Sequence, residues 1–86
     1  MHSTKAFIID DELHSRSFLQ KMLEQYFPEI NVAGHASNVD EGLLGIKKFK
    51  PDIVFLDIRM KGETGFDLLS RLNEINFSLI FTTAYD

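Results

Sequence analysis

Hydrophobic and polar positions along the chain form two alternating kinds of pattern. Short apolar runs occupy residues 79–82, which are expected to form a further strand, and, without polar alternation, residues 6–9 and 53–56. Runs of this length, made of β-branched, aromatic and other apolar residues, are typical of parallel strands buried on both faces. Ile30–Ala36 alternates partly between apolar and polar residues, which predicts an edge strand with one face toward water.

Between the predicted strands, apolar residues recur at helical spacing. Leu13–Tyr26 is expected to be an amphipathic helix, which Pro28 ends. A second helix is expected to begin after Asn38 as N-cap, with Glu41 as its reciprocal N3 partner. A third is expected after a loop at residues 59–64. The predicted apolar stripes of the three helices comprise Phe18, Leu19, Met22, Leu23 and Tyr26; Val39, Leu43, Ile46 and Phe49; and Phe66, Leu69 and Leu72.

Four strands and three helices in strict alternation predict the fold class. The pattern indicates an α/β fold, a doubly wound parallel sheet with right-handed crossovers and helices on both faces. No internal repeat or linker interrupts the 86 residues, so residues 1–86 are expected to form one domain.

Composition narrows the classes of function. The net charge is −4 and no basic stripe is present, so this segment is not expected to bind nucleic acid. No apolar stretch approaches the roughly 20 residues that span a bilayer, so no membrane association is predicted. Cysteine is absent, which excludes disulfides and thiolate metal sites. The polar start at residues 1–5 lacks a signal-peptide core, so a cytoplasmic location is expected.

Acidic residues follow two of the buried strands directly. Asp10 and Asp11 come after the first strand, and Asp57 comes after the strand at residues 53–56. Ligands of open α/β sheets bind outside the carboxyl ends of the strands, and neighbouring strands lie roughly 4.8 Å apart. The three carboxylates are therefore predicted to converge and to require a divalent cation or a shared proton. Thr83 ends the last strand, where its hydroxyl can reach the same crevice.

An ordered set of short motifs carries a family resemblance. These motifs are Asp-Asp-Glu at 10–12, Leu-Asp-Ile-Arg-Met at 56–60, Gly65, and Thr-Thr-Ala at 82–84. In this order and spacing, the whole chain resembles the receiver domain of bacterial two-component response regulators. The resemblance implies a flavodoxin-like fold in which Asp57 accepts a phosphoryl group from a sensor histidine kinase. Such a domain assists its own phosphorylation and dephosphorylation but is not an enzyme that turns over free metabolites.

The resemblance also implies a set of Mg²⁺ ligands. Asp11 would bind Mg²⁺ directly, Asp10 mainly through a metal-bound water, and Asp57 through its carboxylate. The backbone carbonyl of Arg59 would complete the protein ligands. The hydroxyl of Thr83 would contact a phosphoryl oxygen once Asp57 is modified.

Two features depart from the family pattern. Lys61 stands in a loop that usually carries a proline at about this point. Receivers also continue into a fourth helix, a fifth strand with a phosphoryl-pairing lysine, and a fifth helix, whereas this chain ends at Asp86. The expectation is therefore an incomplete receiver domain, truncated after the fourth strand. Self-association is expected through the exposed apolar edge at residues 79–82.

The output of the whole regulator is expected outside this chain. Residues 66–69 and 83–86 resemble the corresponding segments of regulators that carry a LytTR-type DNA-binding domain. This resemblance implies transcription regulation, with DNA bound by that output domain.

Three alternative functions compete with the receiver. A pseudo-receiver would act only as a protein-interaction module, and the absence of the lysine favours it whereas the acidic residues oppose it. A haloacid dehalogenase-like phosphatase needs a second acid two residues after its nucleophile, where this chain has Arg59. A flavin- or nucleotide-binding protein needs a Gly-rich or hydroxyl-rich phosphate loop, but here residues 10–12 are acidic.

Overall fold

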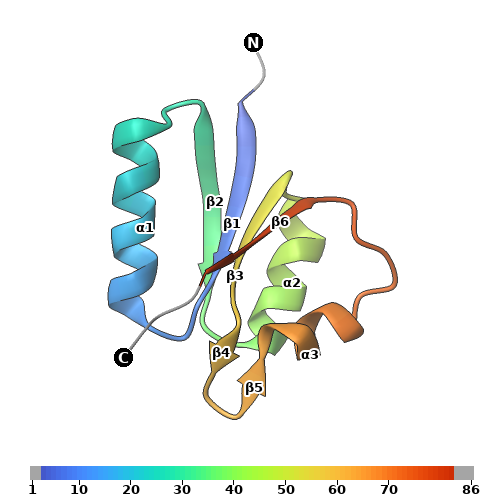
Figure 1. Cartoon of the computed structure of the whole chain (residues 1–86). Helices are drawn as coiled ribbons and strands as arrows, with labels where there is room; N and C mark the ends of the chain where they lie inside the picture. The colour runs from blue at the N-terminus through green and yellow to red at the C-terminus, as the bar shows by residue number, and fades with distance from the viewer. Residues whose placement is uncertain (1–2, 83–86) are drawn as a thin grey trace.

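The computed structural model describes residues 3–82 of the chain. Its main sheet has four parallel strands in the order β2-β1-β3-β6. Helix α1 covers one face of this sheet and helices α2 and α3 cover the other (Figure 1). The predicted doubly wound α/β fold is therefore confirmed. The elements are β1 (Thr4–Ile9), α1 (Leu13–Tyr26), β2 (Ile30–Ala36), α2 (Val39–Phe49), β3 (Ile53–Asp57), β4 (Arg59–Met60), β5 (Glu63–Thr64), α3 (Gly65–Ser70) and β6 (Ser78–Thr82).

The core consists of two apolar layers, one on each face of the sheet. The layer under α2 and α3 is the larger, because alternate residues of three strands meet two helices there. The layer under α1 is smaller. The buried residues of the larger layer are Phe7, Ile9, Ala36, Val39, Val54, Leu56, Met60 and Leu68, and those of the smaller are Ala6, Ile8, Leu23 and Phe55.

Helix α1 buries less of its apolar stripe than predicted. Leu23 is buried and Leu19 packs against the smaller layer, but Phe18, Met22 and Tyr26 are 67%, 40% and 61% exposed. These three side chains lie on one flank of the helix, away from the residues that face the sheet. Only part of the predicted apolar stripe is buried, because α1 is the only described helix on this face and has no described helical neighbour beside that flank.

Helix α3 begins as expected but turns a different side toward the core. Thr64 is its N-cap: the Thr64 hydroxyl accepts the N–H of Asp67, and the Asp67 carboxylate accepts the N–H of Thr64. Leu68 is fully buried, whereas Phe66 is 56% exposed and lies against the ring of Phe81, 5.5 Å away between centroids. Phe66, which was placed on the predicted apolar stripe, therefore lies outside the buried core. In a helix of six residues, the docking of one turn decides which side chains are buried.

Two local predictions need smaller corrections. Asn38 accepts the N–H of Glu41 at 2.8 Å, as an N-cap should. The Glu41 carboxylate does not return the bond to Asn38, because it accepts the N–H and hydroxyl of Ser37 instead. Residues 59–64, predicted as a loop, form an antiparallel hairpin of β4 and β5. Gly62 adopts a φ of +72° at its turn, a conformation that glycine allows.

Close approach of α2 to the sheet depends on Gly45. A Cβ atom at this position would lie 2.1 Å from Cζ of Phe7, much closer than van der Waals contact permits. Phe7 is 1% exposed and sits in the larger layer, so its ring has little room to move. The missing side chain of Gly45 therefore sets the spacing between α2 and β1.

We expect Gly45→Ala to destabilise the fold although alanine favours helices. Overpacking of a filled core costs roughly 1–3 kcal/mol, which should appear as a lower urea midpoint. Gly45→Ala should cost less stability in a Phe7→Leu variant than in the wild type, because leucine leaves room that the phenylalanine ring fills. Additive effects of the two changes would show that the two residues are not in conflict.

In the described part of the chain, no helix has both the length and the apolar character that crossing a bilayer requires.

Candidate functional site

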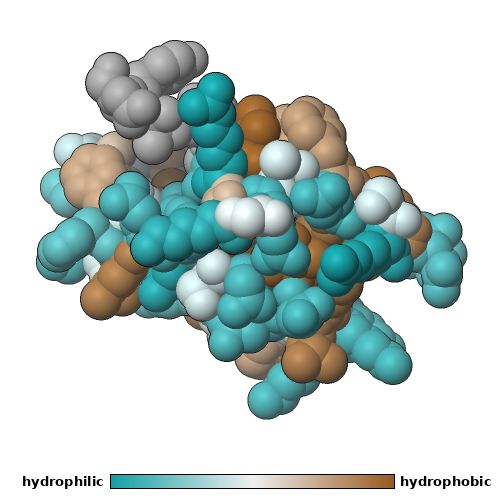
Figure 2. Space-filling view, turned by 90° about the horizontal axis from the view of Figure 1, so that it is seen from below, coloured by the Kyte–Doolittle hydropathy of each residue, from teal (hydrophilic) through white to brown (hydrophobic). Residues whose placement is uncertain are grey.

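Three carboxylates meet where the strands end. Asp10 and Asp11 follow β1 directly, and Asp57 is the last residue of the neighbouring strand β3. One oxygen from each lies within 4.8 Å of the others, so the predicted convergence is present. Figure 2 views this end of the sheet, and hydrophilic residues occupy much of the centre of the face.

Each carboxylate accepts one backbone N–H group. Asp10 accepts the N–H of Glu12 at 2.9 Å, and Asp57 accepts that of Arg59 at 3.2 Å. Asp11 accepts the N–H of Lys61, on the β4–β5 hairpin, at 2.8 Å. These bonds orient the acids but leave most of their lone pairs free for other donors or for a cation.

Burial dominates the electrostatics of the site. Asp57 is only 6% exposed, and burial raises its pKa to about 6 from an ordinary value of 3.8. The N–H of Arg59 opposes this rise, and the charges of Asp10 and Asp11 add to it. Burial likewise raises the pKa of Asp10. The site therefore resists carrying all of its negative charges at once.

The donor set fits a hard divalent cation. Within residues 3–82, the ion pair present joins Arg71 to Asp40, and none involves the three clustered acids. No basic side chain of this range is therefore ion-paired with them, although the nearby charge of Arg16 partly opposes the rise in the pKa of Asp10. Closely spaced carboxylate oxygens of this kind suit Mg²⁺, which prefers oxygen ligands and retains water at its other positions.

The structure describes one of the two other predicted site residues. Arg59 lies in β4, two residues after Asp57, and the role of its carbonyl as a metal ligand stays a prediction. Thr83 lies outside the described residues. In the described part of β6, Thr82 pairs in register with Asp57, so β6 ends beside the acid cluster.

Two contacts at this edge were not predicted from the sequence. Arg16 of α1 donates from a guanidinium nitrogen to the backbone carbonyl of Asp10 at 2.6 Å. Glu63 of the hairpin accepts the N–H of Val39, at the start of α2, at 3.3 Å. A basic residue one turn into the helix after the acid pair was the available signal for Arg16, but helical spacing does not link it to the carbonyl of Asp10.

Sequence and structure comparisons agree on the family. The model of the response regulator receiver domain matches residues 6–86. A response regulatory protein of Vibrio cholerae is 46% identical over 82 residues, which cover 94% of this chain and 34% of that protein. The sensory transduction protein LytT of Bacillus anthracis is 37% identical, with 95% and 34% covered. The chain thus spans about a third of the length of these relatives.

Solved structures with the same fold include receiver domains of response regulators. The signal receiver domain of NarL from Mycobacterium tuberculosis matches with a TM-score of 0.85 at 26% identity, over all of this chain and 70% of that one. The receiver domain of PhyR from Erythrobacter litoralis matches with a TM-score of 0.83 at 30% identity, over 99% and 66%. With its sheet order, its acid cluster and the match over residues 6–86, this chain belongs to the response regulator receiver domain family.

Proposed function

We propose that this chain is a phosphoacceptor module in which Asp57 receives a phosphoryl group from a sensor histidine kinase. The observation that carries the proposal is a buried carboxylate beside two others, with no ion-paired basic side chain in residues 3–82. A merely structural acid at this depth would be expected to have such a partner. The ionised carboxylate of Asp57 can instead act as a nucleophile.

The group transfer forms one bond and breaks another. A carboxylate oxygen of Asp57 attacks phosphorus, the bond from phosphorus to the kinase histidine breaks, and the departing imidazole takes up a proton. The product is an aspartyl phosphate. With a pKa of about 6, Asp57 is mostly ionised at pH 7, as a nucleophile must be.

Mg²⁺ would be held by Asp10, Asp11, Asp57 and the carbonyl of Arg59. When bound, it supplies positive charge that offsets repulsion between the acids and the incoming phosphoryl group. The N–H of Arg59 orients the Asp57 carboxylate, and the N–H of Lys61 ties Asp11 to the hairpin. Thr83 is proposed to contact the phosphoryl group after transfer.

The rest of the regulator is proposed from its relatives. They are about three times as long as this chain, and one is the sensory transduction protein LytT. We infer an output domain of LytTR type outside this chain, through which DNA would be bound and transcription regulated. The present segment would not bind nucleic acid, would act in the cytoplasm, and would assist its own phosphorylation without being a turnover enzyme.

The acid cluster also bears on the alternatives. A pseudo-receiver has no need of three converging carboxylates, and a dehalogenase-like phosphatase would need an acid where Arg59 stands. The two alternatives predict different results. A pseudo-receiver would show no modification of Asp57, and a phosphatase would hydrolyse added phosphate esters continuously.

The outer edge of β6 supports a second proposal, self-association of this chain. In residues 3–82, β6 pairs only with β3, and its five residues, Ser78–Thr82, include no charge and no proline. Ile80 and Phe81 are 45% and 39% exposed. An unprotected apolar edge of this kind pairs readily with another strand, and a second copy can provide one.

We expect acetyl phosphate with Mg²⁺ to add one phosphoryl group to the chain, detectable by intact mass. Asp57→Asn should abolish the addition, and Asp11→Asn should reduce it strongly because a metal ligand is lost. Asp40→Asn, an exposed acid paired with Arg71, is the matched control and should react normally. Equal modification of Asp57→Asn would exclude this residue as acceptor, and an inert wild type would favour the pseudo-receiver.

Burial of Asp57 also predicts an unusual pH dependence of stability. Its folded pKa lies above the unfolded value of 3.8, so the folded state binds the proton more readily. Its contribution is fully present below pH 4 and is lost as pH rises through 6. Without Mg²⁺, Asp57→Asn should therefore stabilise the protein at pH 7 by roughly 1–3 kcal/mol, and the gain should vanish near pH 4. Urea unfolding at both pH values measures this, and an equal effect at both would contradict it.

Self-association through β6 predicts a mass that rises with concentration. Light scattering should show this for the wild type, and Ile80→Lys should suppress it by placing a charge on the edge. Leu44→Lys, which alters an exposed side chain of α2, should not. A folded monomer at high concentration would refute the proposal.

A further inference from the structure

The two consecutive acids of the site require a bend in the backbone. Successive side chains of a strand point to opposite faces of a sheet, yet Asp10 and Asp11 bring carboxylates to the same cluster. The chain achieves this by leaving β1 after Ile9 and bending at Asp11. The peptide unit between Asp10 and Asp11 therefore determines where both carboxylates point.

One side chain holds this peptide unit from outside the loop. The carbonyl of Asp10 accepts the guanidinium of Arg16 at 2.6 Å, in a partly buried contact. The N–H of Asp10, on the other side of the same residue, is fixed by the carbonyl of Ala36 on β2 at 3.0 Å. Asp10 is thus held at both backbone groups, once by the sheet and once by Arg16.

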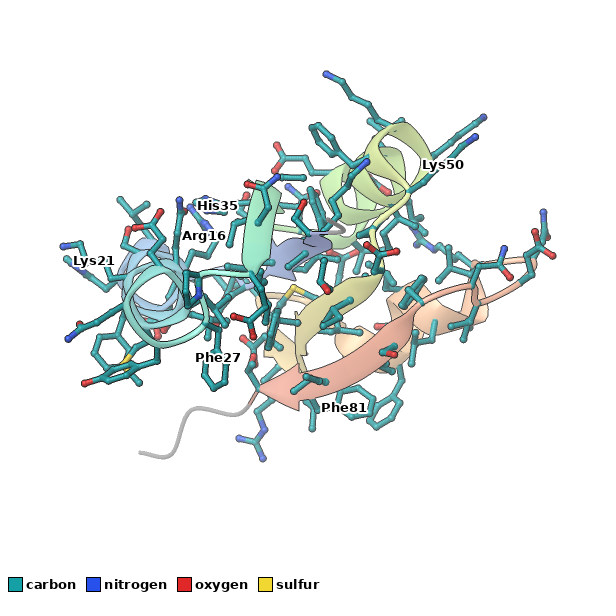
Figure 3. All side chains as sticks on the ribbon, turned by 90° about the horizontal axis from the view of Figure 1, so that it is seen from above. Arg16, Lys21, Phe27, His35, Lys50 and Phe81 are labelled. Atoms are coloured by element: carbon teal, nitrogen blue, oxygen red, sulfur yellow. The ribbon has the colours of Figure 1, made fainter. Side chains whose placement is uncertain are left out.

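The surroundings of Arg16 indicate that this bond is its main polar contact. Figure 3 shows Arg16 between α1 and the sheet, near His35. Its Nε atom is buried without a hydrogen-bond partner in the described part of the chain. Burial of a guanidinium is unfavourable unless strong hydrogen bonds compensate. Arg16 forms no ion pair among residues 3–82, which leaves the Asp10 carbonyl as the group it binds.

We propose that Arg16 is a positioning residue for the cation site, since its bond to the Asp10 carbonyl fixes the bend that brings Asp10 and Asp11 together. This inference rests on the proposed function only in taking Mg²⁺ as the cation. Arg16 itself does not touch the cation or the phosphoryl group. It acts by presetting the directions of two carboxylates before any ligand binds.

Charge and geometry predict opposite effects when Arg16 is removed. If Arg16 acted only as a nearby positive charge, its loss would strengthen Mg²⁺ binding about two- to fivefold. If it positions the ligands, its loss would weaken binding about 10- to 100-fold, as is typical when a group supporting a metal ligand is removed. The direction of the change therefore distinguishes the two roles.

The experiment compares Mg²⁺ affinity in Arg16→Met, Arg16→Lys and wild type by calorimetric titration. Arg16→Met should bind at least tenfold more weakly, and Arg16→Lys should recover part of the loss because it keeps a donor. Lys21→Met is the matched control, since it removes an exposed charge from the same helix and should leave the affinity unchanged. Equal or tighter binding by Arg16→Met would overturn the proposal.

A second measurement needs no metal. The amide of Glu12, bonded to the Asp10 carboxylate, should exchange with solvent about tenfold faster in metal-free Arg16→Met if the bend loosens. Amides of β3 should exchange at wild-type rates, which would show that the fold is intact. Unchanged exchange at Glu12 would refute positioning. A wild type that binds no Mg²⁺ would instead refute the proposed function. The exchange rate of the Glu12 amide in metal-free protein would still decide whether Arg16 holds the bend.

Discussion

Parallel pairing of β1 with β3 is the constraint on which the candidate site depends. Their register places Ile9 opposite Leu56, so Asp10 and Asp57 follow at the same level of the sheet. A shift of one residue would reverse the faces of every side chain in one strand. The buried residues of both strands oppose such a shift, because each face packs into its own apolar layer. The core thereby fixes the distance between the acids.

Bringing like charges together in a partly dehydrated place has an energetic cost, which the raised pKa values of Asp57 and Asp10 reflect. The fold meets this cost with oriented backbone donors and with the packing beneath the site. The hairpin is joined to this arrangement through Lys61 at one point and through Glu63 at another. A change of charge at the cluster would therefore alter the contacts of the hairpin and, through it, the start of α2.

The two faces of the sheet are unequally covered. Gly45 lets α2 approach β1 closely, and α3 completes that side with Leu68. On the other side α1 stands alone among the described residues, with one apolar flank exposed. The outer edge of β6 is exposed as well. Neighbouring exposed apolar side chains are characteristic of regions that contact other chains or other segments.

The sequence by itself determined the order of the four sheet strands and three helices and the acids at the strand ends, but it missed the β4–β5 hairpin. These follow from local properties, namely unbroken apolar runs, the capping residue Asn38, and helix-ending Pro28. Tertiary structure decided which apolar residues are buried: Phe66 is exposed and Leu68 is buried. Helical spacing identifies the apolar stripe of a helix but not the elements that pack against it. Tertiary structure also decided the contact of Arg16 with Asp10. That bond joins a side chain to a backbone carbonyl at a bend, and no pattern of residue types encodes the direction of a carbonyl.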